Sequence, residues 1–123
     1  MKRHKVLIAD DDSRARDGLI SLLATAPEIE VVGEAANGRE AVQYVEEVHP
    51  DVVLMDIRIP EMDGLDATRL IKKSWPEIVV IVLTINTAFQ EESLAAGADA
   101  FLVKGSSAET PLKAILNPGE RHR

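Results

Sequence analysis

Four apolar segments of this 123-residue chain each end in polar residues that could take part in chemistry. The segment KVLIA is followed by three carboxylates, Asp10 to Asp12, and the segment DVVLM is followed by Asp56. IVVIVL leads into the hydroxyl of Thr84, and AFLV leads into the ammonium of Lys104. Carboxylates are ligands of hard divalent cations, whereas an ammonium and a hydroxyl suit a bound anion. The chain therefore carries groups for a cation and groups for an anion.

Periodicity indicates which elements would position these groups. Short runs rich in β-branched residues alternate with helical patterns, and this alternation predicts a βα repeat. Four of the five strand runs are apolar almost throughout, as parallel strands covered on both faces must be, whereas IEVVGEA is mixed and suits an edge. We therefore expect one α/β domain with a five-stranded parallel doubly wound sheet and five helices. The predicted strands cover residues 5–9, 29–35, 51–55, 78–83 and 100–103, and the predicted helices cover 13–25, 39–48, 65–73, 88–96 and 108–116.

The carboxylates of Asp10, Asp11 and Asp56 are expected to share one pocket. In the flavodoxin-like strand order 2-1-3-4-5, the first and third strands are neighbours about 4.8 Å apart, and ligands bind beyond their carboxyl ends. Two charges about 4 Å apart repel by about 4 kcal/mol at an effective dielectric constant of about 20, so the cluster should take up protons or hold a cation. A few oxygen ligands with room for water and phosphate favour Mg²⁺ over Ca²⁺.

Lys104 and Thr84 are groups that a metal site alone does not explain. A phosphoryl group attached to Asp56 would lie between Mg²⁺ and Lys104, and the Thr84 hydroxyl would donate a further hydrogen bond to it. Asp56 is then a nucleophile that accepts the phosphoryl group, assisted by Lys104 and Thr84.

Four motifs together resemble the response-regulator receiver domains of two-component signalling. They are ADD at residues 9–11, VVLMDIRIPEMDG at 52–64, VLT at 82–84 and GADAFLVKGSS at 97–107. The resemblance spans essentially the whole chain, and each motif closes a predicted strand. DDDSRARDGL at residues 10–19 and DIRIPEMDG at 56–64 look most like the subfamily whose receivers precede a LuxR-type helix-turn-helix.

The resemblance implies a role for each site residue. Asp56 would accept phosphate from a sensor histidine kinase. Asp11, Asp56 and the backbone carbonyl of Arg58 would bind Mg²⁺ directly, and Asp10 would reach the ion through water. Arg58 and Asn86 occupy the two positions that tend to tune the lifetime of the phosphoryl group in receivers.

A switch is the second implication of the resemblance. Thr84 would move toward the phosphoryl group, and Phe101 would rotate into the vacated space. The surface of the fourth helix, fifth strand and fifth helix would then change and offer a contact to a partner or to a second copy of the chain, so that phosphorylation promotes a homodimer. Gly105 follows Lys104 where many receivers have proline, so the isomer of this peptide bond stays open.

Two other hypotheses and several simpler roles remain. A phosphatase of the haloacid-dehalogenase type also has an aspartyl nucleophile, and Asp10-x-Asp12 after the first strand is similar to its first motif, but it leaves Asp56 without a role. A phosphorylation-independent interaction module with the receiver fold needs a broken site, whereas every expected residue is present here. Asp12 is expected to cap the first helix, and Phe101 to lie partly in the core.

Composition excludes several classes of partner. The balance of 21 acidic and 14 basic residues, a net charge of -7, repels phosphate backbones, so we expect no direct binding of nucleic acid by this chain. The absence of cysteine excludes disulfides and thiolate metal sites, and the apolar run at 78–83 is too short to cross a membrane. We expect a cytoplasmic, single receiver domain over residues 1–123 that is a signalling domain rather than an enzyme, with the output domain absent from these residues. A missing DNA-binding segment would carry any control of transcription.

Overall fold

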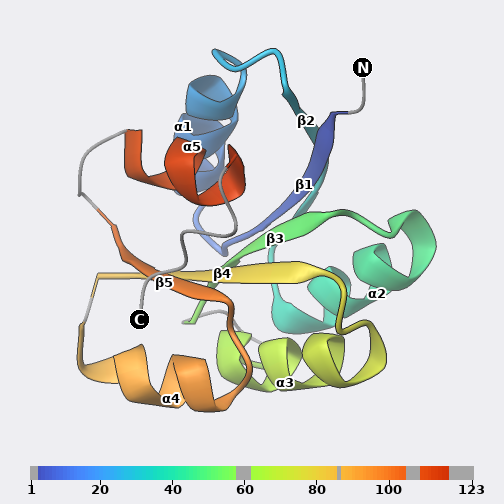
Figure 1. Cartoon of the computed structure of the whole chain (residues 1–123), viewed down its shortest axis with the longest axis vertical. Coiled ribbons are helices and arrows are strands. Elements are labelled where there is room, and N and C mark those ends of the chain that lie inside the picture. Colours follow the sequence, from blue (N-terminus) through green and yellow to red (C-terminus); the bar gives the residue numbers. More distant parts are fainter. Residues whose placement is uncertain (1–2, 58–61, 86, 105–108, 117–123) are drawn as a thin grey trace.

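The computed structural model describes residues 3–57, 62–85, 87–104 and 109–116, in which strands and helices alternate along the chain (Figure 1). The strands are β1 (His4–Ala9), β2 (Ile29–Ala35), β3 (Val52–Asp56), β4 (Val79–Thr84) and β5 (Ala100–Val103). The helices are α1 (Ser13–Leu23), α2 (Gly38–Val48), α3 (Gly64–Ser74), α4 (Gln90–Ala95) and α5 (Glu109–Leu116), with a short 3₁₀ helix, η1 (Thr87–Phe89), before α4.

The sheet has the predicted topology. All neighbouring strands pair in parallel, in the order β2-β1-β3-β4-β5. The mixed segment IEVVGEA is β2 and lies at one edge of the sheet, as expected from its composition. The strand order reverses between β1 and β3, and the carboxyl ends of these two strands flank the point where α/β sheets bind ligands.

Helices cover both faces of the sheet, with α1 and α5 on one face and α2, α3 and α4 on the other (Figure 1). Successive side chains of a strand point to opposite faces, so β1 contributes to two cores. Leu7 and Ala9 pack in the core beneath α2 and α3, whereas Val6 and Ile8 pack in the core beneath α1 and α5. This double burial explains why the central strands are apolar almost throughout.

Side chains cap the three helices that follow β1, β2 and β3. The carboxylate of Asp12 accepts a hydrogen bond from the Arg14 amide at the start of α1, which confirms the predicted cap. Asn37 caps α2 and Asp63 caps α3 in the same way. Because these caps fix where each helix begins, they also set the length of the loops beside the carboxyl edge of the sheet.

The fourth helix is shorter than the sequence predicts. The prediction was residues 88–96, whereas α4 covers only Gln90–Ala95, because residues 87–89 form η1 and Phe89 offers no side-chain cap. The chain leaves α4 through Gly97, whose positive φ of 100° suits glycine. Within the described part of the chain, none of the helices is both long enough and apolar enough to cross a membrane.

Candidate functional site

Four strands bring the predicted site residues to one edge of the sheet. Ala9 of β1 lies opposite Met55 of β3, so the residues that follow them, Asp10 and Asp56, are neighbours. Asp56 is itself the last residue of β3 and lies opposite Leu83 of β4. On the far side of β4, the Lys104 amide donates a hydrogen bond of 2.8 Å to the Thr84 carbonyl. The register of the sheet alone therefore assembles the site.

The three carboxylates among the four predicted metal-binding residues lie together. Asp10, Asp11 and Asp56 each offer a carboxylate oxygen, and these oxygens lie within 4.8 Å of one another. Asp10 is 2% exposed and Asp56 is 8% exposed, while Asp11 faces solvent. Clustered carboxylate oxygens with one open side fit a hard cation that keeps part of its water. The structure thus places these three residues as predicted.

Lys104 joins two of these carboxylates. Its ammonium donates hydrogen bonds to Oδ2 of Asp10 at 2.7 Å and to Oδ2 of Asp56 at 3.0 Å. Burial of the side chain lowers the pKa of Lys104, but the hydrogen bonds and charges of the two carboxylates outweigh this effect and raise the pKa above the usual 10.5. The Lys104 ammonium therefore balances part of the negative charge of the acidic cluster.

This raised pKa predicts a loss of stability at alkaline pH. A folded-state pKa above the unfolded value means that the charge of Lys104 contributes its full stabilisation below pH 10.5 and loses it as pH rises through the folded-state pKa. We expect the difference in free energy of unfolding between wild type and Lys104→Met to be constant around neutrality and to shrink above pH 10.5. Urea denaturation at stepped pH measures this difference. A difference that stays unchanged into the alkaline range would contradict the assignment.

The Asp10 segment is held by further contacts. The Asp12 amide donates a hydrogen bond to Oδ1 of Asp10, and the guanidinium of Arg16 donates one to the Asp10 carbonyl. Arg16 also pairs with the carboxylate of Glu34 at 3.0 Å, which ties α1 to the edge strand β2. Sequence reasoning missed Arg16; the available signal was a basic residue on the first turns of a helix that follows three acids.

Thr84 and Phe101 are both buried on neighbouring strands, and the switch between them stays a prediction. Thr84 ends β4 and is 2% exposed, and Phe101 on β5 is 3% exposed. Phe101 lies opposite Val82, two residues before Thr84, and packs in the core beneath α2 and α3. The expectation that Phe101 belongs to the core is confirmed for this conformation.

Three predictions concern residues outside the described part of the chain. Arg58, whose carbonyl was expected to bind the metal, and Asn86, expected to tune the phosphoryl lifetime, are not among the described residues. The same holds for Gly105 and therefore for the Lys104–Gly105 peptide bond.

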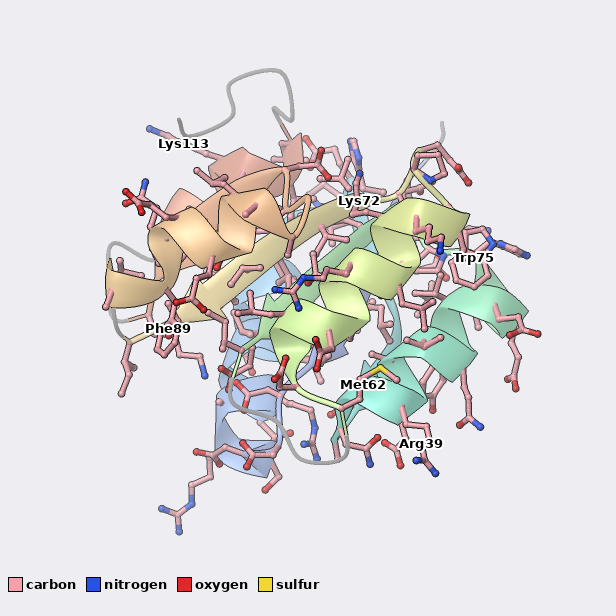
Figure 2. The ribbon with its side chains drawn as sticks, turned by 90° about the horizontal axis from the view of Figure 1, so that it is seen from below. Arg39, Met62, Lys72, Trp75, Phe89 and Lys113 are labelled. Atoms are coloured by element: carbon pink, nitrogen blue, oxygen red, sulfur yellow. The ribbon has the colours of Figure 1, made fainter. Side chains whose placement is uncertain are left out.

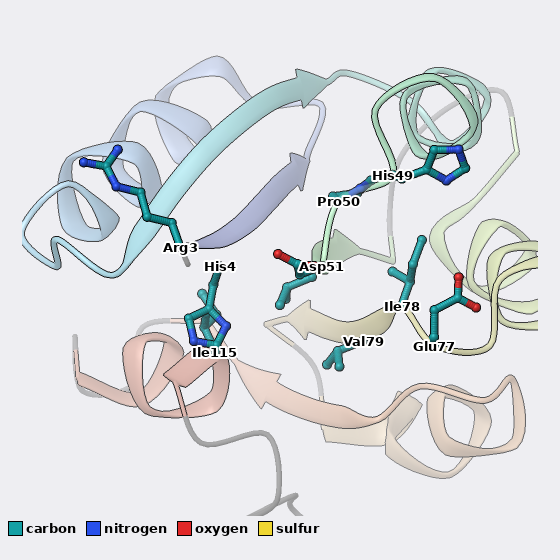
Figure 3. Close-up of a pocket in the computed structure, with 10 residues that line it drawn as sticks. Arg3, His4, His49, Pro50, Asp51, Glu77, Ile78, Val79 and Ile115 are labelled. Atoms are coloured by element: carbon teal, nitrogen blue, oxygen red, sulfur yellow. The ribbon is translucent and has the colours of Figure 1, made fainter. Parts of the chain in front are cut away.

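A pocket of about 590 Å³ lies at the amino ends of the strands, away from the acidic site (Figure 3). It contains none of the predicted site residues, because its walls come from the amino ends of β1, β3 and β4 and from α5. The chemistry predicted from sequence instead gathers at the carboxyl edge. Residues lining the pocket include His4, His49, Asp51, Glu77 and Ile115.

Comparisons with known proteins agree with this geometry. A family model described as the response regulator receiver domain matches residues 6–116. The transcriptional regulatory protein LnrK of Bacillus subtilis (strain 168) is 42% identical over 114 residues, which cover 91% of this chain and 52% of that protein. The response regulator protein VraR of Staphylococcus aureus is 42% identical over 113 residues, which cover 90% of this chain and 54% of VraR. The chain thus spans about half the length of the curated relatives it matches.

Solved structures share the same fold. The signal receiver domain of the putative response regulator NarL from Mycobacterium tuberculosis has a TM-score of 0.90 and 30% identity, and the alignment covers 98% of this chain and 100% of that one. A two-component response regulator of the LuxR family from Aurantimonas sp. SI85-9A1 has a TM-score of 0.91 and 29% identity, with 98% of this chain and 89% of that one covered.

Proposed function

This chain belongs to the response-regulator receiver domain family, and we propose that it accepts a phosphoryl group on Asp56 from a sensor histidine kinase in a Mg²⁺-dependent reaction. The observation that carries the proposal is the contact of the Lys104 ammonium with the carboxylates of both Asp10 and Asp56. An ammonium placed between a cation-binding cluster and a nucleophile is what a transferring phosphoryl group requires.

The donor set fits Mg²⁺. Asp10, Asp11 and Asp56 would hold the ion, and the carbonyl of Arg58, outside the described residues, would complete the protein ligands. The ion would neutralise charge on the phosphoryl oxygens, which is the chemistry it supplies in phosphoryl transfer. Each of the three carboxylates is available from a strand end or the residues just after one, so the set is held by the sheet rather than by a long loop.

The chain's own residues divide the reaction between them. A carboxylate oxygen of Asp56 forms a bond to phosphorus while the bond between phosphorus and the leaving group of the donor breaks. Lys104 neutralises the transferred oxygens, and Thr84, at the end of the neighbouring strand, donates a hydrogen bond to one of them. Asp56 is 8% exposed, which limits access of water to the resulting acyl phosphate.

By this proposal, the domain transmits a signal and does not convert a separate substrate. Thr84 and Phe101 would relay the modification to the surface of α4, β5 and α5, where a second copy of the chain could bind. The haloacid-dehalogenase hypothesis is less favoured, because it leaves Asp56, a buried carboxylate of the same cluster in contact with Lys104, without a role. An interaction module that needs no phosphorylation is less favoured too, because the described part of the site is complete.

The output is proposed from the relatives. LnrK is a transcriptional regulator, and another neighbour is described as a DNA-binding response regulator of the LuxR family from Staphylococcus aureus. We propose that this receiver controls transcription in the cytoplasm through a DNA-binding segment outside these residues. The net charge of -7 supports a model in which the other segment binds DNA and the receiver itself does not.

Acetyl phosphate provides the direct test of this function. The protein is incubated with this small phosphodonor with and without Mg²⁺, and its intact mass is measured. We expect one phosphoryl adduct that forms with Mg²⁺ and not with excess chelator, because the carboxylate cluster needs the ion to accept more negative charge. Peptide mapping should place the adduct on the segment that contains Asp56. The proposal would be contradicted if no adduct formed at any Mg²⁺ concentration, or if the adduct formed equally well in excess chelator.

A further inference from the structure

Two glycines leave no room for a side chain around residues 62–64, where the chain enters α3. If Gly38, the first residue of α2, carried a Cβ atom, that atom would lie 1.9 Å from the carbonyl oxygen of Met62. If Gly64, the first residue of α3, carried one, it would lie 2.1 Å from the carbonyl oxygen of Asp56. Both neighbours are backbone atoms, which cannot rotate away as a side chain can. The chain from Met62 to Gly64 is therefore held between α2 and the backbone of Asp56.

Further contacts hold this segment in a single conformation. Met62 has a φ of 86°, which residues with a side chain rarely adopt, so its surroundings must impose it. The Gly64 amide donates a hydrogen bond of 2.9 Å to the Ile57 carbonyl, which joins the start of α3 to the residue after Asp56. Figure 2 shows Met62 beside the first turn of α2, close to Arg39.

The first turn of α2 is itself rigid. Asn37 caps the helix by accepting a hydrogen bond from the Glu40 amide, and the Glu40 carboxylate accepts one from the Ala36 amide. These two hydrogen bonds, one from the helix amide and one from the amide just before the cap, fix the direction in which the helix begins. Because Gly38 is buried and lies inside this capped turn, its α-carbon is a fixed support against the Met62 carbonyl.

We propose that Gly38 is a positioning residue for the metal site: by having no side chain, it lets the Met62 carbonyl lie against α2, and the contact of Gly64 with the Asp56 carbonyl connects this support to the acidic cluster. The proposal rests on the function proposed above. Non-bonded carbon and oxygen atoms stay about 3.0 Å apart, so a methyl group at residue 38 must displace the Met62 carbonyl or the helix by about 1 Å. The Gly64 contact with Asp56 passes that displacement to the acidic cluster.

The test compares the same substitution at three glycines. We expect Gly38→Ala to weaken Mg²⁺ binding by about tenfold or more, the loss typical when a group that supports a metal ligand is disturbed. Binding is followed by amide NMR signals in a Mg²⁺ titration, without any phosphodonor. With acetyl phosphate, the variant should need more Mg²⁺ for half-maximal adduct formation yet reach the wild-type rate at saturating Mg²⁺.

Two matched controls separate positioning from loss of stability. A Cβ on Gly18 of α1 would meet nothing within 4 Å, so Gly18→Ala should bind Mg²⁺ like wild type. A Cβ on Gly33 of β2 would press on the Tyr44 ring at 3.1 Å, so Gly33→Ala should destabilise the fold without changing Mg²⁺ affinity. Wild-type affinity in Gly38→Ala, or an equal loss in Gly33→Ala, would overturn the proposal.

The wild-type protein offers a test that needs no variant. Coupling between two sites is reciprocal, so Mg²⁺ should shift the amide signals of Gly38 and Arg39 while leaving Gly18 in place. This measurement decides the question if Gly38→Ala does not fold, and an unshifted Gly38 signal would overturn the proposal. If wild type takes no phosphoryl group at all, the proposed function fails; if it does and Gly38 proves unimportant, only the positioning role fails.

Discussion

Asp56→Asn is expected to take no phosphoryl group from acetyl phosphate at any Mg²⁺ concentration. The carboxamide that replaces the Asp56 carboxylate is not a nucleophile. Asp10 also contacts Lys104, but in the proposed site it serves the metal ion and does not accept the phosphoryl group. The fold should survive, because the substitution keeps the shape of the side chain and relieves repulsion among the carboxylates. Intact mass after incubation with acetyl phosphate measures the adduct, and urea denaturation checks the fold.

Two further substitutions test whether the loss of the phosphoryl adduct is specific to Asp56. Asp17→Asn, an exposed change on α1, should leave the adduct at the wild-type yield. Asp10→Asn should slow the reaction by weakening the metal site, yet still allow the adduct at high Mg²⁺ concentration. If instead Asp10→Asn abolished the adduct and Asp56→Asn kept it, the nucleophile would lie after β1, as the haloacid-dehalogenase hypothesis requires.

Lys104→Met is expected to destabilise the metal-free protein by about 2 to 3 kcal/mol. Removal of one partner from a buried ion pair typically costs about 3 to 5 kcal/mol, and the Lys104 side chain is 26% exposed, which reduces the effect. The loss arises because the substitution removes the ammonium that contacts the buried carboxyl groups of Asp10 and Asp56. Urea denaturation with a chelator at neutral pH measures the change in free energy of unfolding.

Mg²⁺ should restore much of this lost stability. An ion that binds only the folded state stabilises it, and it should do so more strongly where no ammonium competes for the same oxygens. We therefore expect a larger stabilisation by Mg²⁺ in Lys104→Met than in wild type. Lys113→Met, an exposed change on α5, should alter stability by less than about 0.5 kcal/mol with or without the ion. Equal responses of wild type and Lys104→Met to Mg²⁺ would contradict a shared set of oxygens.

Much of the fold and of the acidic site could be predicted from sequence because parallel strands deliver their carboxyl ends to one edge. An apolar run followed by a carboxylate or an ammonium marks such an end, so Asp10, Asp56 and Lys104 could be placed together without coordinates. The bounds of the fourth helix could not be predicted, because a local 3₁₀ turn and a missing cap leave little trace in a hydrophobic pattern.

Contacts to the main chain were the other features that sequence could not reveal. Arg16 binds the Asp10 carbonyl, and every residue has a carbonyl, so a basic residue after three acids suggests a nearby contact but not this partner atom. Lys72 is similar: in the last turn of a helix it resembles a solvated cation, yet it donates hydrogen bonds to the carbonyls of Pro76 and Ile78 and to the carboxylate of Asp99. Gly38 matters through the backbone of Met62, which no periodicity encodes.

The hydrogen bonds of Lys104 have a consequence for the order in which the protein is made. They join residues that lie 94 and 48 positions apart, and the lysine is always the later partner to be synthesised. In a chain still growing on the ribosome, Asp10 and Asp56 are made before Lys104, whose ammonium balances their charge. The site around Asp56 is therefore incomplete until β5 has paired with β4. If the proposed function holds, a growing chain becomes able to accept a phosphoryl group only after β5 has been made and paired, and fragments that end before β5 do not compete for phosphoryl groups.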